Sequence, residues 1–163
     1  MVSAVKRDVK LYNLLFPVWM FYFLPTVLWL LILPGNFLVD SAVLFAAMTV
    51  FHLAEKKEIW KRSILPVWVV GFLSDFAGAA LTFGLMLLTD QFTPGWDTFL
   101  FPGGQLLVLP GIALAGVLIY FLNRRFSFRK TGLAAPDIHR LCLALALFTA
   151  PYTMLWPVEW LYF

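Results

Sequence analysis

The sequence predicts an all-α fold, a polytopic bundle of about five transmembrane helices that forms one domain over residues 1–163. The chain is 62% hydrophobic and 13% charged, whereas soluble domains are about half apolar and about a quarter charged. Its apolar residues form five long runs, each near the length that crosses a ~30 Å hydrocarbon core. All 12 Lys and Arg lie before the first run, between the second and third, or between the fourth and fifth. Because cytoplasmic loops are enriched in Lys and Arg, we expect a multi-pass protein of the cell membrane with a cytoplasmic N-terminus and an outer C-terminus.

The first predicted hairpin consists of two apolar runs and a turn. The first run, about residues 14–33, follows basic residues. It is longer than the core of a signal peptide and no small-residue cleavage site follows it, so we expect a retained helix. Pro17 and Pro25 predict a kink within this helix. Residues 34–36, with the sequence Pro-Gly-Asn, predict a tight turn, and residues 37–53 predict the second helix.

The second hairpin and the last helix follow from the same pattern. Residues 55–62 are predicted to form a short charged cytoplasmic loop, and residues 64–88 a helix long enough to tilt in the bilayer. Residues 89–105 form the longest outer connection and are too aromatic for a plain solvated loop, which favours an interfacial or re-entrant hairpin. The rest of the chain is assigned as a fourth helix at 106–122, a second cytoplasmic loop at 123–139 and a fifth helix at 140–156.

The sequence contains one internal similarity. Residues 15–24 resemble residues 64–73, and both segments open an apolar run with Pro-Val-Trp. A duplication would be a parallel repeat of hairpins 14–53 and 64–122, and parallel repeats occur in transporter folds. The alternative is convergence, since Pro at a helix start and Trp at the membrane interface are each favoured locally.

Asp75 is the acid that needs an explanation. It lies about 16 Å into its apolar run, close to the middle of a ~30 Å core. Gly71, Asp75, Gly78 and Thr82 recur at helical spacing, with Ser74 adjacent; we call this set the polar stripe. Small residues of this kind mark close helix packing, so we expect the stripe to face protein or a cavity. Three interpretations stay open: a protonated structural acid, an acid that exchanges protons or binds a small cation during transport, or one that receives the cationic group of a ligand.

A second acid, Asp40, lies about 6 Å below the predicted outer turn and shares a helix face with Asn36. For untilted helices, Asp40 and Asp75 differ in depth by about 8 Å, which predicts no direct carboxyl contact but allows a path through water. We expect an outward-facing polar vestibule, with Asn36 and Asp40 at its mouth and Asp75 at its bottom. The alternative for this pair is local capping of a helix by Asn36.

Several other functions are not indicated by the sequence. The positions of the basic residues are explained by topology, so we expect no nucleic-acid partner. His52 and His139 lie near predicted cytoplasmic helix ends, far from the outer acids, so no metal site is expected. Cys142 lies in an apolar run and is interpreted as a small buried hydrophobic residue. No catalytic triad, P-loop or dinucleotide motif occurs, so we expect neither an enzyme nor a cofactor.

Residues 120–128 have the sequence Tyr-Phe-Leu-Asn-Arg-Arg-Phe-Ser-Phe. This segment resembles the one that ends a helix in GtrA-like membrane proteins, which are implicated in moving polyprenyl-linked sugars. In that family the segment follows the second of four helices, whereas here it follows the fourth of the five predicted. The resemblance covers only this segment, and it implies lipid-linked substrates.

The sequence therefore predicts a transporter or channel-like protein that binds a small solute or cation at an intramembrane acidic site. The residues assigned to that site are Asp75, Asp40, Asn36, Ser74 and Thr82. The alternative is a non-transporting accessory, lipid-binding or lipid-linked-sugar-handling subunit in which Asp75 only packs. Five helices form a thin bundle in the lipid bilayer, so we expect a homo-oligomer or a partner membrane protein.

Overall fold

The computed structural model of the chain describes residues 29–93 and 103–155. The described residues contain no β-strand, so the predicted all-α class is confirmed. The first apolar run up to residue 28, most of the outer connection and the C-terminal tail lie outside the described residues. The elements are α1 (Trp29–Val50), α2 (Lys56–Phe92), α3 (Gly103–Leu122), the π-helical turn η3 (Asn123–Ser127), α4 (Ala135–Phe148) and the 3-10 turn η4 (Tyr152–Leu155).

Four helical segments of the described residues are long and apolar enough to cross a membrane. The chain is therefore compatible with a multi-pass membrane protein. A fifth crossing and the orientation of the two termini stay predictions. The four segments are Ile32–Val50, Lys56–Phe92, Gly104–Ser127 and Ala135–Leu155.

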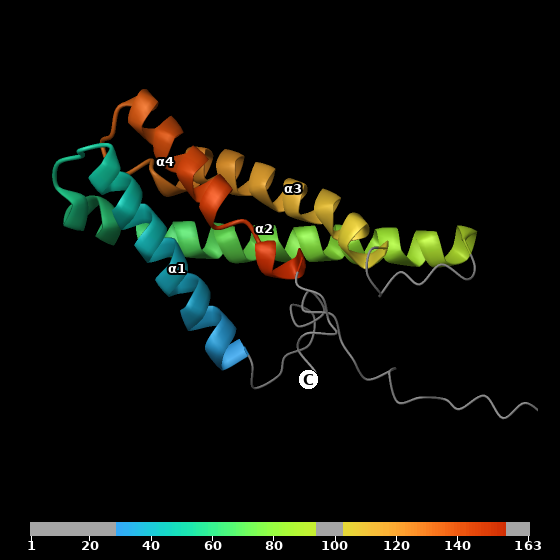
Figure 1. Ribbon diagram of the computed structural model, residues 1–163. Coiled ribbons are helices and arrows are strands. Elements are labelled where there is room, and N and C mark those ends of the chain that lie inside the picture. The colour runs from blue at the N-terminus through green and yellow to red at the C-terminus, as the bar shows by residue number, and fades with distance from the viewer. Residues whose placement is uncertain (1–28, 94–102, 156–163) are drawn as a thin grey trace, which may run out of the picture.

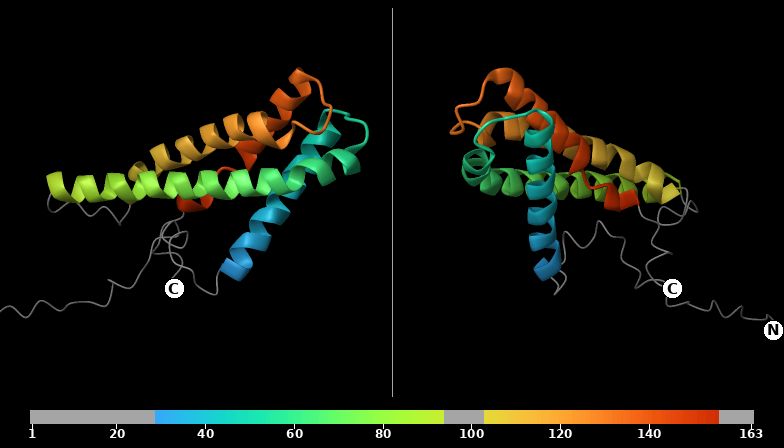
Figure 2. Two further views of the ribbon diagram at one scale, coloured as in Figure 1. Left: turned by 180° about the vertical axis from the view of Figure 1, so that it is seen from behind. Right: turned by 60° about the vertical axis from the view of Figure 1, so that its left-hand side comes forward.

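The helices are arranged around α2, the long helix that runs through the centre of Figure 1. α3 returns alongside α2 in the opposite direction, and the two form the most extensive helix pair. α1 crosses α2 steeply, and α4 packs against both α1 and α3 (Figure 2). Residues from three helices are thereby brought together around the first half of α2.

The predicted turn at residues 34–36 is wrong, because α1 continues through it from Trp29 to Val50. Pro34 removes one backbone donor, but ending the helix inside an apolar medium would leave many more backbone groups without partners. The neighbouring helix also supports this region, since Trp68 Nε1 donates to the Leu33 carbonyl at 3.1 Å. The predicted helices 14–33 and 37–53 are thus corrected at their junction, and the first predicted hairpin loses its turn.

The connection between α1 and α2 is shorter than predicted. α1 ends in a Schellman motif: His52 is in the left-handed region with φ 53°, and Leu53 N donates to Met48 O at 3.0 Å. α2 then begins at Lys56, so all of the charged segment 55–62 except Glu55 is helical and the prediction of a loop there is wrong. Glu58 and Arg62 form an i,i+4 ion pair on the surface of this segment, at 3.0 Å.

α2 is much longer than the predicted helix 64–88. Its 37 residues correspond to about 55 Å, which exceeds a ~30 Å hydrocarbon core. The charged first turns therefore extend beyond the apolar part of the helix. The sequence pattern identifies the apolar part but not this polar extension, because polarity alone does not distinguish an exposed helix from a loop.

The second predicted loop, residues 123–139, is also largely helical. α3 continues into η3, where Asn123 Nδ2 donates to the Ile119 carbonyl at 2.9 Å and Ser127 Oγ donates to Asn123 Oδ1 at 2.5 Å. α4 begins at Ala135, with Pro136 in its first turn, where Pro costs no helical hydrogen bond. It ends at Phe148, before Pro151, so the predicted fifth helix 140–156 starts too late and ends too late.

The Lys and Arg of the described residues gather at one end of the bundle, which we call the basic end. It is formed by the start of α2, the end of α3 with η3, and the start of α4 (Figure 1). Arg62 joins two of these parts by donating to the Lys130 carbonyl at 3.3 Å. The predicted clustering on one side is consistent with this arrangement. The basic residues are Lys56, Lys57, Lys61, Arg62, Arg124, Arg125, Arg129, Lys130 and Arg140.

Candidate acid site within the helices

Asp40 lies where α1, α2 and α4 meet, with only 4% of its surface exposed. Its carboxyl rests against Gly71 of α2, where an added β-carbon would stand 3.2 Å from Asp40 Oδ2. Thr149, at the end of α4, lies close to the same carboxyl. Three helices thus contribute to the surroundings of one buried acid.

The Thr149 hydroxyl lies beside Asp40 and donates to the Leu145 carbonyl at 2.8 Å. The same carbonyl also accepts from the Thr149 backbone N–H at 2.8 Å. The hydroxyl could therefore turn its proton to an ionised Asp40 while the Leu145 carbonyl keeps its backbone hydrogen bond. Thr149 thus offers Asp40 a donor without a break in the last turn of α4.

Asp75 lies near the middle of α2, on the same face as Gly71 and with 5% of its surface exposed. The adjacent Ser74 is fully buried and donates to the Val70 carbonyl at 2.7 Å. Four residues separate Gly71 from Asp75, so the level of Asp40 and that of Asp75 differ by about 6 Å along the α2 axis. The separation is similar in size to the predicted ~8 Å, but its direction is opposite.

The order of the two acids is the reverse of the predicted vestibule. α2 begins at the basic end, so Gly71, and with it Asp40, lies nearer that end than Asp75 does. The prediction measured the depth of Asp40 from a turn at residues 34–36, but α1 begins at Trp29 and contains no such turn. Asp40 therefore lies farther from the start of its helix than the predicted turn implied.

Asn36 lies inside α1, one turn before Asp40, and is partly buried. The shared face of the two residues follows from this continuous helix. The alternative in which Asn36 caps a helix at a turn is wrong, because no helix begins there.

Thr82 belongs to the contact between α2 and α3, two helical turns beyond Asp75. Its hydroxyl donates to the Gly78 carbonyl at 3.1 Å. The two helices approach so closely that a β-carbon at Gly78 would lie 2.5 Å from the Gly111 carbonyl oxygen, and one at Gly111 would collide with Thr82. The polar stripe therefore faces protein as predicted. Gly71 meets α1, whereas Gly78 and Thr82 meet α3.

Sequence reasoning did not identify Thr149. The residue follows an apolar helix and precedes Pro151 by two positions, so it resembles an ordinary helix terminus. Only the packing of α4 against α1 reveals its proximity to Asp40. No sequence signal could have connected two residues this far apart without an alignment.

The described residues offer no group of three or more His, Cys, Asp or Glu that could hold a metal ion. Cys142 is fully buried in the cluster that packs α4 against α1 and α3. Its role there is that of a small apolar side chain, as its sequence surroundings predict.

The fold and these residues define a class: an all-helical bundle, compatible with a multi-pass membrane protein, that buries two acids between its helices. No protein-family model matches the sequence, and no curated protein or solved structure matches it.

Proposed function

We propose that this chain is a membrane protein of the transport class, in which Asp40 and Asp75 bind a proton, a small cation or the cationic group of a solute. The observation that carries the proposal is the placement of the two buried acids on facing helices, about one helical turn apart. Acids within membrane spans are costly, and they mark ion and proton pathways in other proteins.

The charge balance supports this function. Two carboxylates at this spacing repel each other in an apolar medium, and a bound positive charge relieves the repulsion. The Lys and Arg of the described residues lie at the basic end; along α4, Arg140 is nine residues before Thr149, or about 14 Å away. A proton or cation that enters and leaves would therefore change the charge of the site.

Thr149 offers a way to couple binding at the acids to α4. On loss of the proton from Asp40, the Thr149 hydroxyl would turn from Leu145 to the carboxylate, while the Leu145 carbonyl keeps its hydrogen bond from the Thr149 backbone. A change at the acids would thus reach a second helix without any large rearrangement. Transport requires a coupling of this kind between occupancy and conformation.

The experiment is a flux measurement on the full-length chain in sealed lipid vesicles. Protons, monovalent cations and a panel of small organic cations are tested with the wild type, Asp75→Asn, Asp40→Asn and Asp90→Asn. Asp90 is an exposed acid at the far end of α2 and serves as the control. We expect the first two variants to lose about tenfold or more, equivalent to ~1.4 kcal/mol of binding, and Asp90→Asn to retain wild-type flux.

Folding is monitored in every variant by circular dichroism and thermal unfolding. Wild-type flux in correctly folded Asp75→Asn and Asp40→Asn would sink the proposal. So would a wild-type protein that moves none of the tested ions. Either outcome favours the non-transporting alternative, in which the acids serve only to pack the helices.

A further inference from the structure

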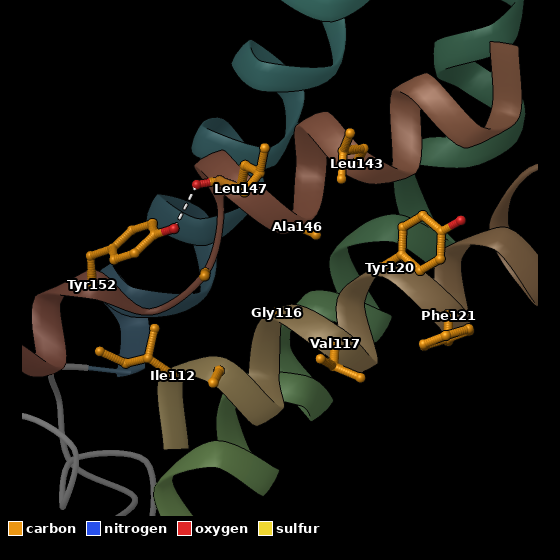
Figure 3. Close-up of a pocket in the computed structure, with 11 residues that line it drawn as sticks. Ile112, Gly116, Val117, Tyr120, Phe121, Leu143, Ala146, Leu147 and Tyr152 are labelled. Atoms are coloured by element: carbon orange, nitrogen blue, oxygen red, sulfur yellow. Dashed lines mark hydrogen bonds between the residues drawn. The ribbon is translucent and has the colours of Figure 1, made fainter. Parts of the chain in front are cut away.

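A groove runs between α3 and α4, on a part of the molecule that the acid site does not use (Figure 3). It has a volume of about 340 Å³ and is almost entirely apolar. Small residues, Gly116, Ala146 and Ala150, form its floor, and larger exposed side chains such as Val117 and Leu147 form its walls.

The groove has a length and a direction. It extends along α3 from Ile112 to Phe121, or about 14 Å, which is close to half of a ~30 Å hydrocarbon core. Phe121 is the end that adjoins the basic end of the bundle. In a bilayer this groove would therefore cover one leaflet, the leaflet at the basic end.

Polar donors lie at the mouth of the groove beside the basic end. Arg124 Nη1 donates to the Tyr120 hydroxyl at 3.1 Å, and that hydroxyl lies 2.8 Å from His139 Nδ1. Because Arg can only donate, the Tyr120 oxygen accepts from Arg124 and its own proton is available for Nδ1. In the tautomer in which Nδ1 accepts that proton, His139 carries its own proton on Nε2, and Arg124 and His139 both keep N–H donors for a further acceptor.

The mouth and the groove lie on continuous helix faces. Arg124, in η3, follows Val117 and Tyr120 of α3 at helical spacing, and His139 precedes Leu143 and Ala146 in the same way on α4. Figure 3 shows Tyr120 and Phe121 at one end of the groove, opposite Ile112 and Tyr152. A molecule in the groove would thus meet apolar surface along its length and cationic donors at one end.

We propose that this groove binds one anionic glycerophospholipid from the leaflet at the basic end, with an acyl chain in the groove and its headgroup phosphate at Arg124 and His139. Charge and length identify the occupant. The groove fits an apolar chain as long as half of the hydrocarbon core, and the donors of Arg124 and His139 fit an anion at its end. Basic pockets between membrane helices bind anionic headgroups in this way. The inference does not depend on the function of Asp40 and Asp75.

The headgroup contact is tested by native mass spectrometry of the full-length protein released from detergent, titrated with phosphatidylglycerol or with phosphatidylcholine of the same chains. We expect one phosphatidylglycerol to be retained, with about tenfold weaker retention in Arg124→Gln, since a hydrogen bond to a charged group is of that order. Arg125→Gln is the matched control, because Arg125 is adjacent, equally charged and directed at Phe126, whose ring centroid is 5.8 Å from its guanidinium carbon.

The groove itself is tested by filling it. Ala113 lines the groove and is exposed, so Ala113→Phe should block the acyl chain without disturbing the core. Ala80→Phe places the same side chain at an exposed position of α2 outside the groove and should bind like the wild type. Glycerophosphoglycerol, the headgroup without acyl chains, should not be retained by any variant.

The results distinguish a specific lipid site from non-specific annular lipid. Equal retention of both phospholipids by the wild type would overturn the proposal. It would also be overturned if Arg125→Gln weakened binding as much as Arg124→Gln, or if Ala113→Phe left the bound lipid in place. Loss in Arg124→Gln and Ala113→Phe together, with both controls unaffected, would establish the site.

Discussion

The carboxyl of Asp40 rests on the backbone of Gly71, so that a β-carbon at position 71 would stand only 3.2 Å from Oδ2. This contact joins α1 to α2 at the level of the buried acids, and the hydroxyl of Thr149 brings α4 to the same point. Few side chains other than hydrogen would leave the carboxyl where it is. A substitution at position 71 should therefore displace the Asp40 carboxyl while Asp40 itself is unchanged.

Gly71→Ala should reduce flux through the reconstituted protein, because the new methyl group displaces the Asp40 carboxyl by a few tenths of an ångström. The matched control is Gly84→Ala, since a β-carbon at Gly84 meets nothing within 4 Å. Both variants make the same chemical change within α2. Equal flux in the two variants would show that the contact between Asp40 and Gly71 does not affect transport.

Gly78→Ala should destabilise the helix pair α2–α3, because the added β-carbon would lie 2.5 Å from the Gly111 carbonyl oxygen, which belongs to the backbone. Overpacking of this kind costs about 1–3 kcal/mol. Gly84→Ala should instead gain up to about 1 kcal/mol from helix propensity. Thermal unfolding in detergent should thus move in opposite directions for the two variants, and a rise for Gly78→Ala would contradict the close contact.

His52→Gly should stabilise the connection between α1 and α2. His52 has a φ of 53°, a conformation that costs a non-glycine residue about 1–2 kcal/mol, of which glycine is relieved. The control is Ala54→Gly, at an exposed position of the same connection that is not among the residues with positive φ. A rise in unfolding temperature for His52→Gly alone is the expected result, and a fall would refute the assigned turn.

Asn123→Ala should destabilise the end of α3 more than Ser127→Ala does. The Asn123 amide donates to the Ile119 carbonyl and accepts from Ser127, and both side chains are buried. Leaving a buried polar group unsatisfied costs about 1–3 kcal/mol. The unfolding temperatures of the two single variants and of the double variant show which substitution destabilises the protein more. An effect of Ser127→Ala larger than that of Asn123→Ala would contradict this network.

The apolar runs of this sequence were sufficient to predict helices but not where they end. Hydropathy detects the apolar part of α2, whereas its charged first turns resemble a loop. The Pro-Gly-Asn segment at 34–36 favours a turn locally, but in an apolar medium the backbone is stabilised by continuing the helix. Both errors arise because local composition was weighed without the surrounding helices.

The polar stripe was predictable because its spacing alone places it on one face of a helix. Gly71, Asp75 and Gly78 are buried as that spacing indicates. The partners of the stripe were not predictable: Asp40 and Gly111 come from other helices, and their contacts depend on crossing geometry. The order in depth of Asp40 and Asp75 was inferred in reverse because the depth of Asp40 was measured from a turn at residues 34–36, where α1 is continuous.

The central claim is that Asp40 and Asp75 exchange a proton or a cation, and infrared difference spectroscopy of the protein in lipid tests it most directly. Carboxyl bands are compared between pH values and between cation concentrations, and are assigned by their loss in Asp40→Asn and Asp75→Asn. The account predicts bands that change with pH or with cation and that disappear in these two variants but not in Asp90→Asn. Carboxyl bands of Asp40 and Asp75 that stay constant under all these conditions would contradict it.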